Sequence, residues 1–155
     1  MTPGVKEIQI RRWSKVVANT CLISALALPA LVLLGLYLSE RALPLWMSAL
    51  GLLPVILFSV SMVAAYRCFA SFAQGQWFSQ HPASHLRKSG IYLVWASFAG
   101  IVIPVLIEAL AAQNSITLSI SSYQFQSLLF GAIIWVLGSV WQDAYLVAKE
   151  NAEFV

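Results

Sequence analysis

The sequence predicts an all-α membrane protein, a four-helix transmembrane bundle whose second and third helices continue into an extended cytoplasmic hairpin. Its 155 residues are 60% hydrophobic and only 10% charged, with a mean hydropathy of +0.81, whereas a soluble domain averages about 25% charged residues. Four long apolar runs are each close to the roughly 20 residues that a helix needs to cross ~30 Å of hydrocarbon. Because backbone groups in lipid must be hydrogen-bonded within the segment, these runs predict helices.

The apolar runs set the expected helix boundaries. They cover residues 16–38, 45–66, 91–112 and 127–147. We expect the helices themselves at about 16–38, 45–73, 80–112 and 126–148, in a single membrane domain of residues 1–155. The first run has 23 residues, which exceeds the roughly 7 to 15 of a signal-peptide apolar region, so we expect a membrane helix there.

The segment between the second and third runs, SFAQGQWFSQHPASHLRKSG, predicts a helical hairpin. Gly75 is the first residue that would stop the second helix, because glycine readily adopts the left-handed conformation of a helix C-terminus. Ser79 is a good N-cap for the next helix. Pro82 would be its third residue, where the missing N–H costs little. Trp77 and Phe78 then form an apolar tip, a candidate surface for a partner together with His81 and His85.

Lysine and arginine residues predict the orientation. Eight of the nine lie before the first run, between the second and third, or after the fourth, and only Arg41 lies at the other side. Since cytoplasmic loops carry the excess of basic residues, we expect both termini and the hairpin in the cytoplasm. This distribution also explains the net charge of +3 without a nucleic-acid partner.

Two acidic residues fall inside the expected helices, Glu108 near the outer end of the third and Asp143 near the inner end of the fourth. Acidic groups in a membrane are costly and therefore informative. We expect Glu108 to pair with Arg41 or with water. The basic residues expected at the level of Asp143 are Arg67, Arg87 and Lys88. The alternative is that the two acids line a conduction path, although they lie at opposite ends.

No catalytic, cofactor-binding or metal site is expected. His81 and His85 are four residues apart and share a helix face, which is the spacing of helical metal sites, but the only thiol nearby is Cys68. We therefore interpret them as solvated interfacial residues. Cys21 and Cys68 are expected to be free thiols, because both lie near the cytoplasmic, reducing side, and the absence of a C-x-x-C pair disfavours a thiol oxidoreductase.

Prolines and small residues predict where the helices bend and pack. Pro29, Pro54 and Pro104 lie well inside the expected helices, where a proline removes a hydrogen bond and kinks the helix. Such kinks could open a cavity, but we prefer to interpret them as ordinary packing features. Small residues one turn apart predict close-packing faces; they are Ser61 with Ala65, and Ala96 with Gly100.

The hairpin and the C-terminal segment together resemble a family of small bacterial inner-membrane proteins catalogued as domain of unknown function 2975. The matching hairpin positions are Phe72, Gly75, Phe78, Ser79, Leu86, Arg87 and Gly90. Those in WQDAYLVAKENAEFV are Ala144, Leu146, Glu150, Asn151 and Val155. The resemblance covers essentially the whole chain and implies a four-helix protein of the bacterial inner membrane, with no established activity and no catalytic residue to transfer.

Three classes of function remain open. The favoured one is a non-enzymatic multi-pass protein that acts through partners, either a second copy of itself or another membrane or regulatory protein. The alternative is a small oligomeric transporter or channel, which the kinked helices and the two acids would suit. A membrane enzyme is least favoured, because no cysteine pair, serine–histidine pair or metal-binding set converges at one depth.

Overall fold

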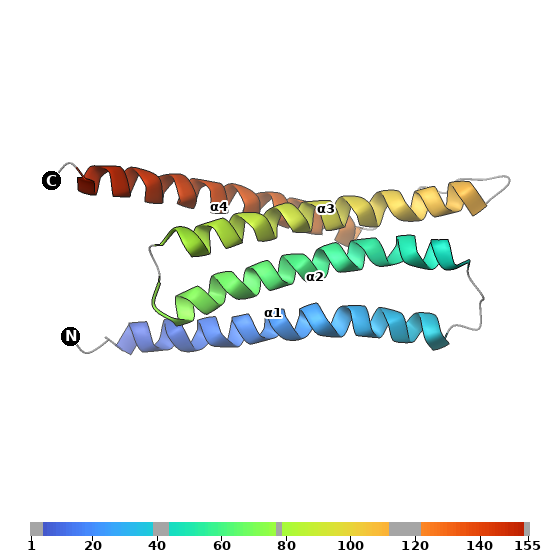
Figure 1. Ribbon diagram of the computed structural model, residues 1–155, viewed down its shortest axis with the longest axis horizontal. Coiled ribbons are helices and arrows are strands. Elements are labelled where there is room, and N and C mark those ends of the chain that lie inside the picture. The colour runs from blue at the N-terminus through green and yellow to red at the C-terminus, as the bar shows by residue number, and fades with distance from the viewer. Residues whose placement is uncertain (1–4, 39–43, 77–78, 112–121, 154–155) are drawn as a thin grey trace.

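The computed structural model describes residues 5–38, 44–76, 79–111 and 122–153, and these fold into four α-helices (Figure 1). They are α1 (Val5–Leu38), α2 (Leu45–Ala73), α3 (Gln80–Ala111) and α4 (Ser122–Glu153). No strand occurs in these ranges. The predicted all-α class and the number of helices are confirmed.

All four helices are long and apolar enough to cross a membrane. They contain 29 to 34 residues, or about 44 to 51 Å at 1.5 Å per residue, against ~30 Å of hydrocarbon. Large hydrophobic side chains are exposed along every one of them, an arrangement that suits lipid and would be a liability in water. The chain has the structure expected of a multi-pass membrane protein.

The first and last helices are longer than the apolar runs predict. α1 begins at Val5 instead of residue 16, and Arg11 Nη2 donates to Glu7 Oε1 at 2.7 Å within the added turns. Such a pair at i and i+4 supports a helix locally. α4 extends from 122 to 153 instead of 126 to 148. A hydropathy boundary marks where the chain leaves lipid, and a helix can continue past that point.

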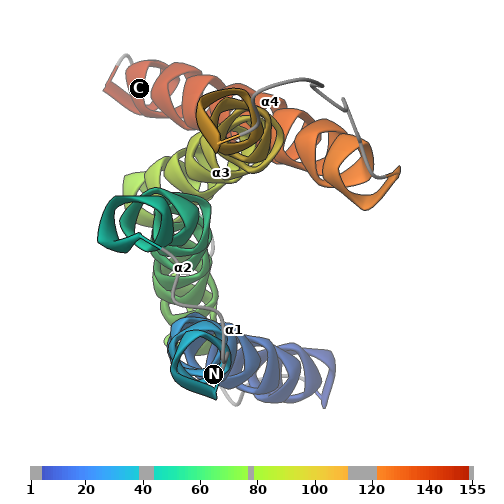
Figure 2. The ribbon, with the colours of Figure 1, turned by 90° about the vertical axis from the view of Figure 1, so that its right-hand side faces the viewer.

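The four helices form a curved row instead of a closed bundle (Figure 2). The backbone of each helix packs only against its neighbours in sequence: α1 on α2, α2 on α3, and α3 on α4. The accessible surface is 10948 Å², whereas a compact protein of 17.0 kDa would expose about 7,700 Å². The row therefore has a concave face, and α1 and α4 do not close it.

Small polar residues join α2 to α3. Ser61 Oγ donates to the backbone oxygen of Ser89 at 2.9 Å, and both side chains are buried. Cys68 and Pro82 are fully buried farther along the same seam. Ser61 and Ala65, predicted to form a close-packing face, are both buried, and Ser61 makes its contact with α3.

Glycines let α3 and α4 approach backbone to backbone. A Cβ atom on Gly90 would overlap the backbone nitrogen of Trp135 and lie 2.8 Å from the oxygen of Gly131. A Cβ atom on Gly138 would lie 2.5 Å from the nitrogen of Arg87. Only glycine fits such contacts, which are typical of membrane helix pairs.

The predicted stop at Gly75 is confirmed. Its φ is +83°, its N–H donates to the Phe72 oxygen at 2.9 Å, and the N–H of Gln76 donates to the Ser71 oxygen at 3.1 Å. These two bonds are those of a Schellman motif, which caps the last carbonyls of a helix. The Arg11 guanidinium packs against Gly75 and would collide with any Cβ atom there.

The predicted N-cap at Ser79 is wrong in its side-chain detail. Ser79 does directly precede α3, and Pro82 is the third residue of that helix as expected. However, Ser79 Oγ is buried and has no hydrogen-bond partner within the described ranges. The hydroxyl therefore makes no capping bond to the first N–H groups of α3.

Substituting Gly90 with alanine should lower the free energy of unfolding by about 1 to 3 kcal/mol, because an added methyl in a tight contact forces backbone shifts. Gly35→Ala is the matched control, since a Cβ there meets nothing within 4 Å, and alanine favours a helix over glycine by up to about 1 kcal/mol. Unfolding by sodium dodecyl sulfate in mixed micelles, followed by circular dichroism, measures both. Equal stability of the two variants would contradict the close contact.

Candidate functional site

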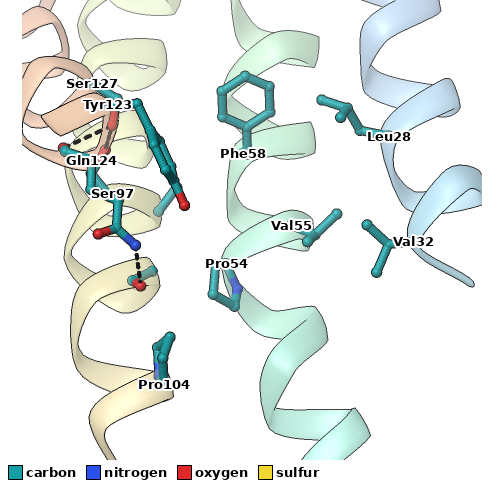
Figure 3. Close-up of a pocket in the computed structure, with 12 residues that line it drawn as sticks. Leu28, Val32, Pro54, Val55, Phe58, Ser97, Pro104, Tyr123, Gln124 and Ser127 are labelled. Atoms are coloured by element: carbon teal, nitrogen blue, oxygen red, sulfur yellow. Dashed lines mark hydrogen bonds between the residues drawn. The ribbon is translucent and has the colours of Figure 1, made fainter. Parts of the chain in front are cut away.

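A cavity of about 440 Å³ lies in the concave face and is lined by all four helices (Figure 3). Its walls from α1 and α2 are apolar and include Leu28, Val32, Val55 and Phe58. The wall from α3 and α4 adds polar side chains; they are Ser97, Tyr123, Gln124 and Ser127. Cavities of this size and mixed lining are typical of binding sites.

Hydrogen bonds hold the polar wall in place. The hydroxyl oxygens of Ser97 and Ser127 lie 2.8 Å apart and so connect α3 with α4. Each is also within bonding distance of a carbonyl in its own helix, Leu93 for Ser97 and Gln124 for Ser127. A wall cross-linked in this way is stiff, because each side chain is fixed at more than one point.

The amide of Gln124 satisfies a carbonyl that a proline leaves unpaired. Pro104 lies inside α3 and has no N–H to donate to the carbonyl of Gly100, four residues earlier. Gln124 Nε2 donates to this Gly100 oxygen at 2.8 Å from the neighbouring helix. A neighbouring side chain is one way in which a membrane protein tolerates proline. Pro54 and Pro104 both line the cavity, which favours the alternative interpretation that prolines shape one.

The cavity lies toward the C-terminal ends of α1 and α3 and the N-terminal ends of α2 and α4. There the Tyr123 side chain crosses the opening with its hydroxyl toward α2 (Figure 3). Toward the other end, Phe72 of α2 stacks on Trp141 of α4 with ring centroids 5.3 Å apart. This stack is a side-chain bridge between two helices that otherwise do not pack together.

Asp143 does not form the expected ion pair within the described part of the chain. Asp143 is exposed, and no ion pair joins it to Arg67, Arg87 or Lys88. Arg87 instead directs Nη1 to Gln142 Oε1 at 3.4 Å, because the tight α3–α4 contact places the neighbouring residue opposite it. Arg41, the expected partner of Glu108, lies outside the described residues, as do Trp77 and Phe78 of the hairpin tip.

The histidines lie at the start of α3, His81 exposed and His85 half-buried. No group of three or more His, Cys, Asp or Glu side chains that could hold a metal ion occurs among the described residues. Cys68 is fully buried between helices, and both cysteines are free thiols. These residues do not converge with the polar wall of the cavity.

Gln124 is not among the residues predicted from the sequence, because hydropathy assigns it to the loop before the fourth helix. The structure starts α4 at Ser122, so Tyr123 and Gln124 belong to its first turn. One sequence signal could have found it: the carbonyl four residues before Pro104 requires a donor from elsewhere.

No protein-family model, curated protein or solved structure matches the chain. The resemblance to domain of unknown function 2975 therefore stays a prediction.

Replacing Gln124 with leucine should lower the free energy of unfolding by about 0.6 to 1.7 kcal/mol, the range for hydrogen bonds between membrane helices. Gln126→Leu, at an exposed position of α4, should cost less. Pro104→Ala restores an N–H for the Gly100 carbonyl, so Gln124→Leu should cost less in that background. Equal costs in both backgrounds, measured in mixed micelles, would disprove the link between Pro104 and Gln124.

Proposed function

We propose that the chain is a non-enzymatic multi-pass protein of the bacterial inner membrane that acts by binding the transmembrane helix of a partner protein. The observation that carries this proposal is the open concave face, where α1 and α4 do not meet and a cavity of about 440 Å³ remains between all four helices. A partner helix lying in this face would contact all four helices at once.

Packing in a membrane favours such a role. Lipid tails are as apolar as leucine, so helices associate through close packing and hydrogen bonds. Pro54 and Pro104 line the concave face and contribute to its shape, and the polar wall provides hydrogen-bonding groups. Tyr123 is 67% exposed, and its hydroxyl makes no hydrogen bond within the described ranges, so it is available to a partner.

The alternative, a small oligomeric transporter or channel, has one supporting feature, the prolines that line the cavity. A transport path for an ion needs polar groups at successive depths. Neither of the two described cavities includes Glu108 or Asp143, and the larger one is mainly apolar. The partner role is therefore preferred.

The proposed location places both termini and the α2–α3 hairpin in the cytoplasm. Two facts support it: the termini and the hairpin lie at the same end of the array (Figure 1), and eight of the nine lysine and arginine residues belong to that end.

Fluorescent protein fused to the C-terminus should therefore fluoresce, and alkaline phosphatase fused there should be inactive. Active phosphatase would reverse the orientation.

A photoreactive phenylalanine at position 58 should capture a single polypeptide in intact membranes, because Phe58 lines the cavity. The matched control is the same replacement at Phe98, which is 51% exposed and not part of the cavity. We expect lipid adducts alone from position 98.

Mass spectrometry of the adduct then separates a second copy of this chain from a different protein. Val55→Trp, which fills the cavity, should abolish the protein adduct from position 58. Lipid adducts alone from both positions, or the same protein adduct from both, would contradict docking in the concave face.

A further inference from the structure

Two groups of basic residues near the hairpin differ in their contacts. Arg11 pairs with Glu7 at 2.7 Å and packs on Gly75, and Arg87 reaches Gln142 on α4. Four others belong to α2 and α3 and have no acidic partner within the described ranges. They are Arg67, His81, His85 and Lys88, called here the basic face.

Helix geometry brings the basic face together. His81, His85 and Lys88 are separated by four and three residues, so they follow one another along one side of α3. The bond between Ser61 and Ser89 fixes the register of α2 against α3. Arg67 lies six residues beyond Ser61, or about 9 Å along α2, and His85 lies four residues before Ser89, or about 6 Å along α3. Because the two helices are antiparallel, both displacements run in the same direction. Burial, and after it the nearby charges of Arg67, Lys88 and His81, lower the pKa of His85, so these groups lie close to it and its imidazole contributes N–H donors more than charge.

Nothing acidic on the same two helices offsets this charge. α2 contains no aspartate or glutamate, and the one acid of α3, Glu108, lies near the opposite end of that helix. Arg67, His81 and Lys88 are exposed. The face is therefore complementary to an anion.

The basic face lies where apolar helix surface begins. Arg67 directly follows the apolar run of α2, and Lys88 precedes that of α3. Tyr92 and Trp95, four and seven residues beyond Lys88, continue the same side of α3, and Trp95 is 56% exposed. This order of cations, aromatic rings and apolar side chains matches that of a phospholipid from headgroup to acyl chain.

We propose that Arg67, His81, His85 and Lys88 bind the phosphate headgroup of an anionic phospholipid in the leaflet at the hairpin end. Charge complementarity selects a phosphate, and the aromatic and apolar surface beside it selects a lipid over free phosphate. The site is separate from the concave face, and its failure would leave the partner role unaffected.

The test titrates the full chain in mild detergent with phosphatidylglycerol, phosphatidylcholine or inorganic phosphate, with bound ligand counted by native mass spectrometry. We expect phosphatidylglycerol to bind at least tenfold more tightly than phosphatidylcholine. Inorganic phosphate at equal concentration should neither bind nor displace it. Equal binding of the two lipids would overturn the proposal, and displacement by inorganic phosphate would show a free-anion site instead.

Arg67→Gln and Lys88→Gln should each weaken phosphatidylglycerol binding about fivefold, since one basic residue near a membrane surface contributes about 1 kcal/mol. Arg12→Gln is the matched control, because Arg12 is exposed on α1 and should change binding less than twofold. Circular dichroism verifies that each variant is folded. An equal loss from Arg12→Gln would reduce the effect to net charge and overturn the assigned site.

Discussion

The backbone contact between α3 and α4 at Gly90 is the constraint on which the rest of the array depends. With Gly131 against Gly90 and Gly138 against Arg87, the two helices have a single antiparallel register. That register places Ser127 opposite Ser97 and Gln124 opposite Gly100 in one direction. In the other direction it carries Trp141 over to Phe72 of α2. The polar wall of the cavity and the aromatic bridge are both consequences of how closely two glycine-bearing helices can approach.

The second constraint is the backbone's need for hydrogen bonds in lipid. Pro104 leaves the Gly100 carbonyl without its helical donor, and this carbonyl accounts for the position of the Gln124 amide. A polar side chain in a membrane helix would ordinarily suggest a transport path. Here the Gln124 amide has a structural role, because it donates to the Gly100 carbonyl. The same bond stiffens the polar wall and so fixes the shape of the cavity. A polar residue in a membrane helix can thus serve the backbone of a neighbouring helix.

The sequence predicts the local features of this fold better than its assembly. Helix number follows from apolar run length, and the stop at Gly75 follows from the left-handed conformation that glycine permits. The sequence predicted a bundle, and the open row that the helices form instead was not predictable, because the outer and inner faces of a membrane helix are equally apolar. For the same reason Gly90 and Gly35 look alike in sequence, although one is pressed against another backbone and the other meets nothing within 4 Å. Arg87 and Asp143 are likewise expected at the same depth in the membrane. The way α3 and α4 cross nevertheless places Gln142 and not Asp143 within reach of Arg87.

An open array of this kind is stable in lipid for a reason that also limits what can bind it. In water, an uncovered apolar face would drive association by itself, but lipid covers the concave face at little cost in free energy. A partner must therefore displace lipid by fitting the surface better than acyl chains do, or by hydrogen-bonding where they cannot. Pro54 and Pro104, which line the cavity, belong to the surface that would supply the first, and the exposed Tyr123 hydroxyl provides a group for the second. Recognition in the concave face would accordingly depend on shape and on a few polar atoms, and hardly at all on its total apolar area.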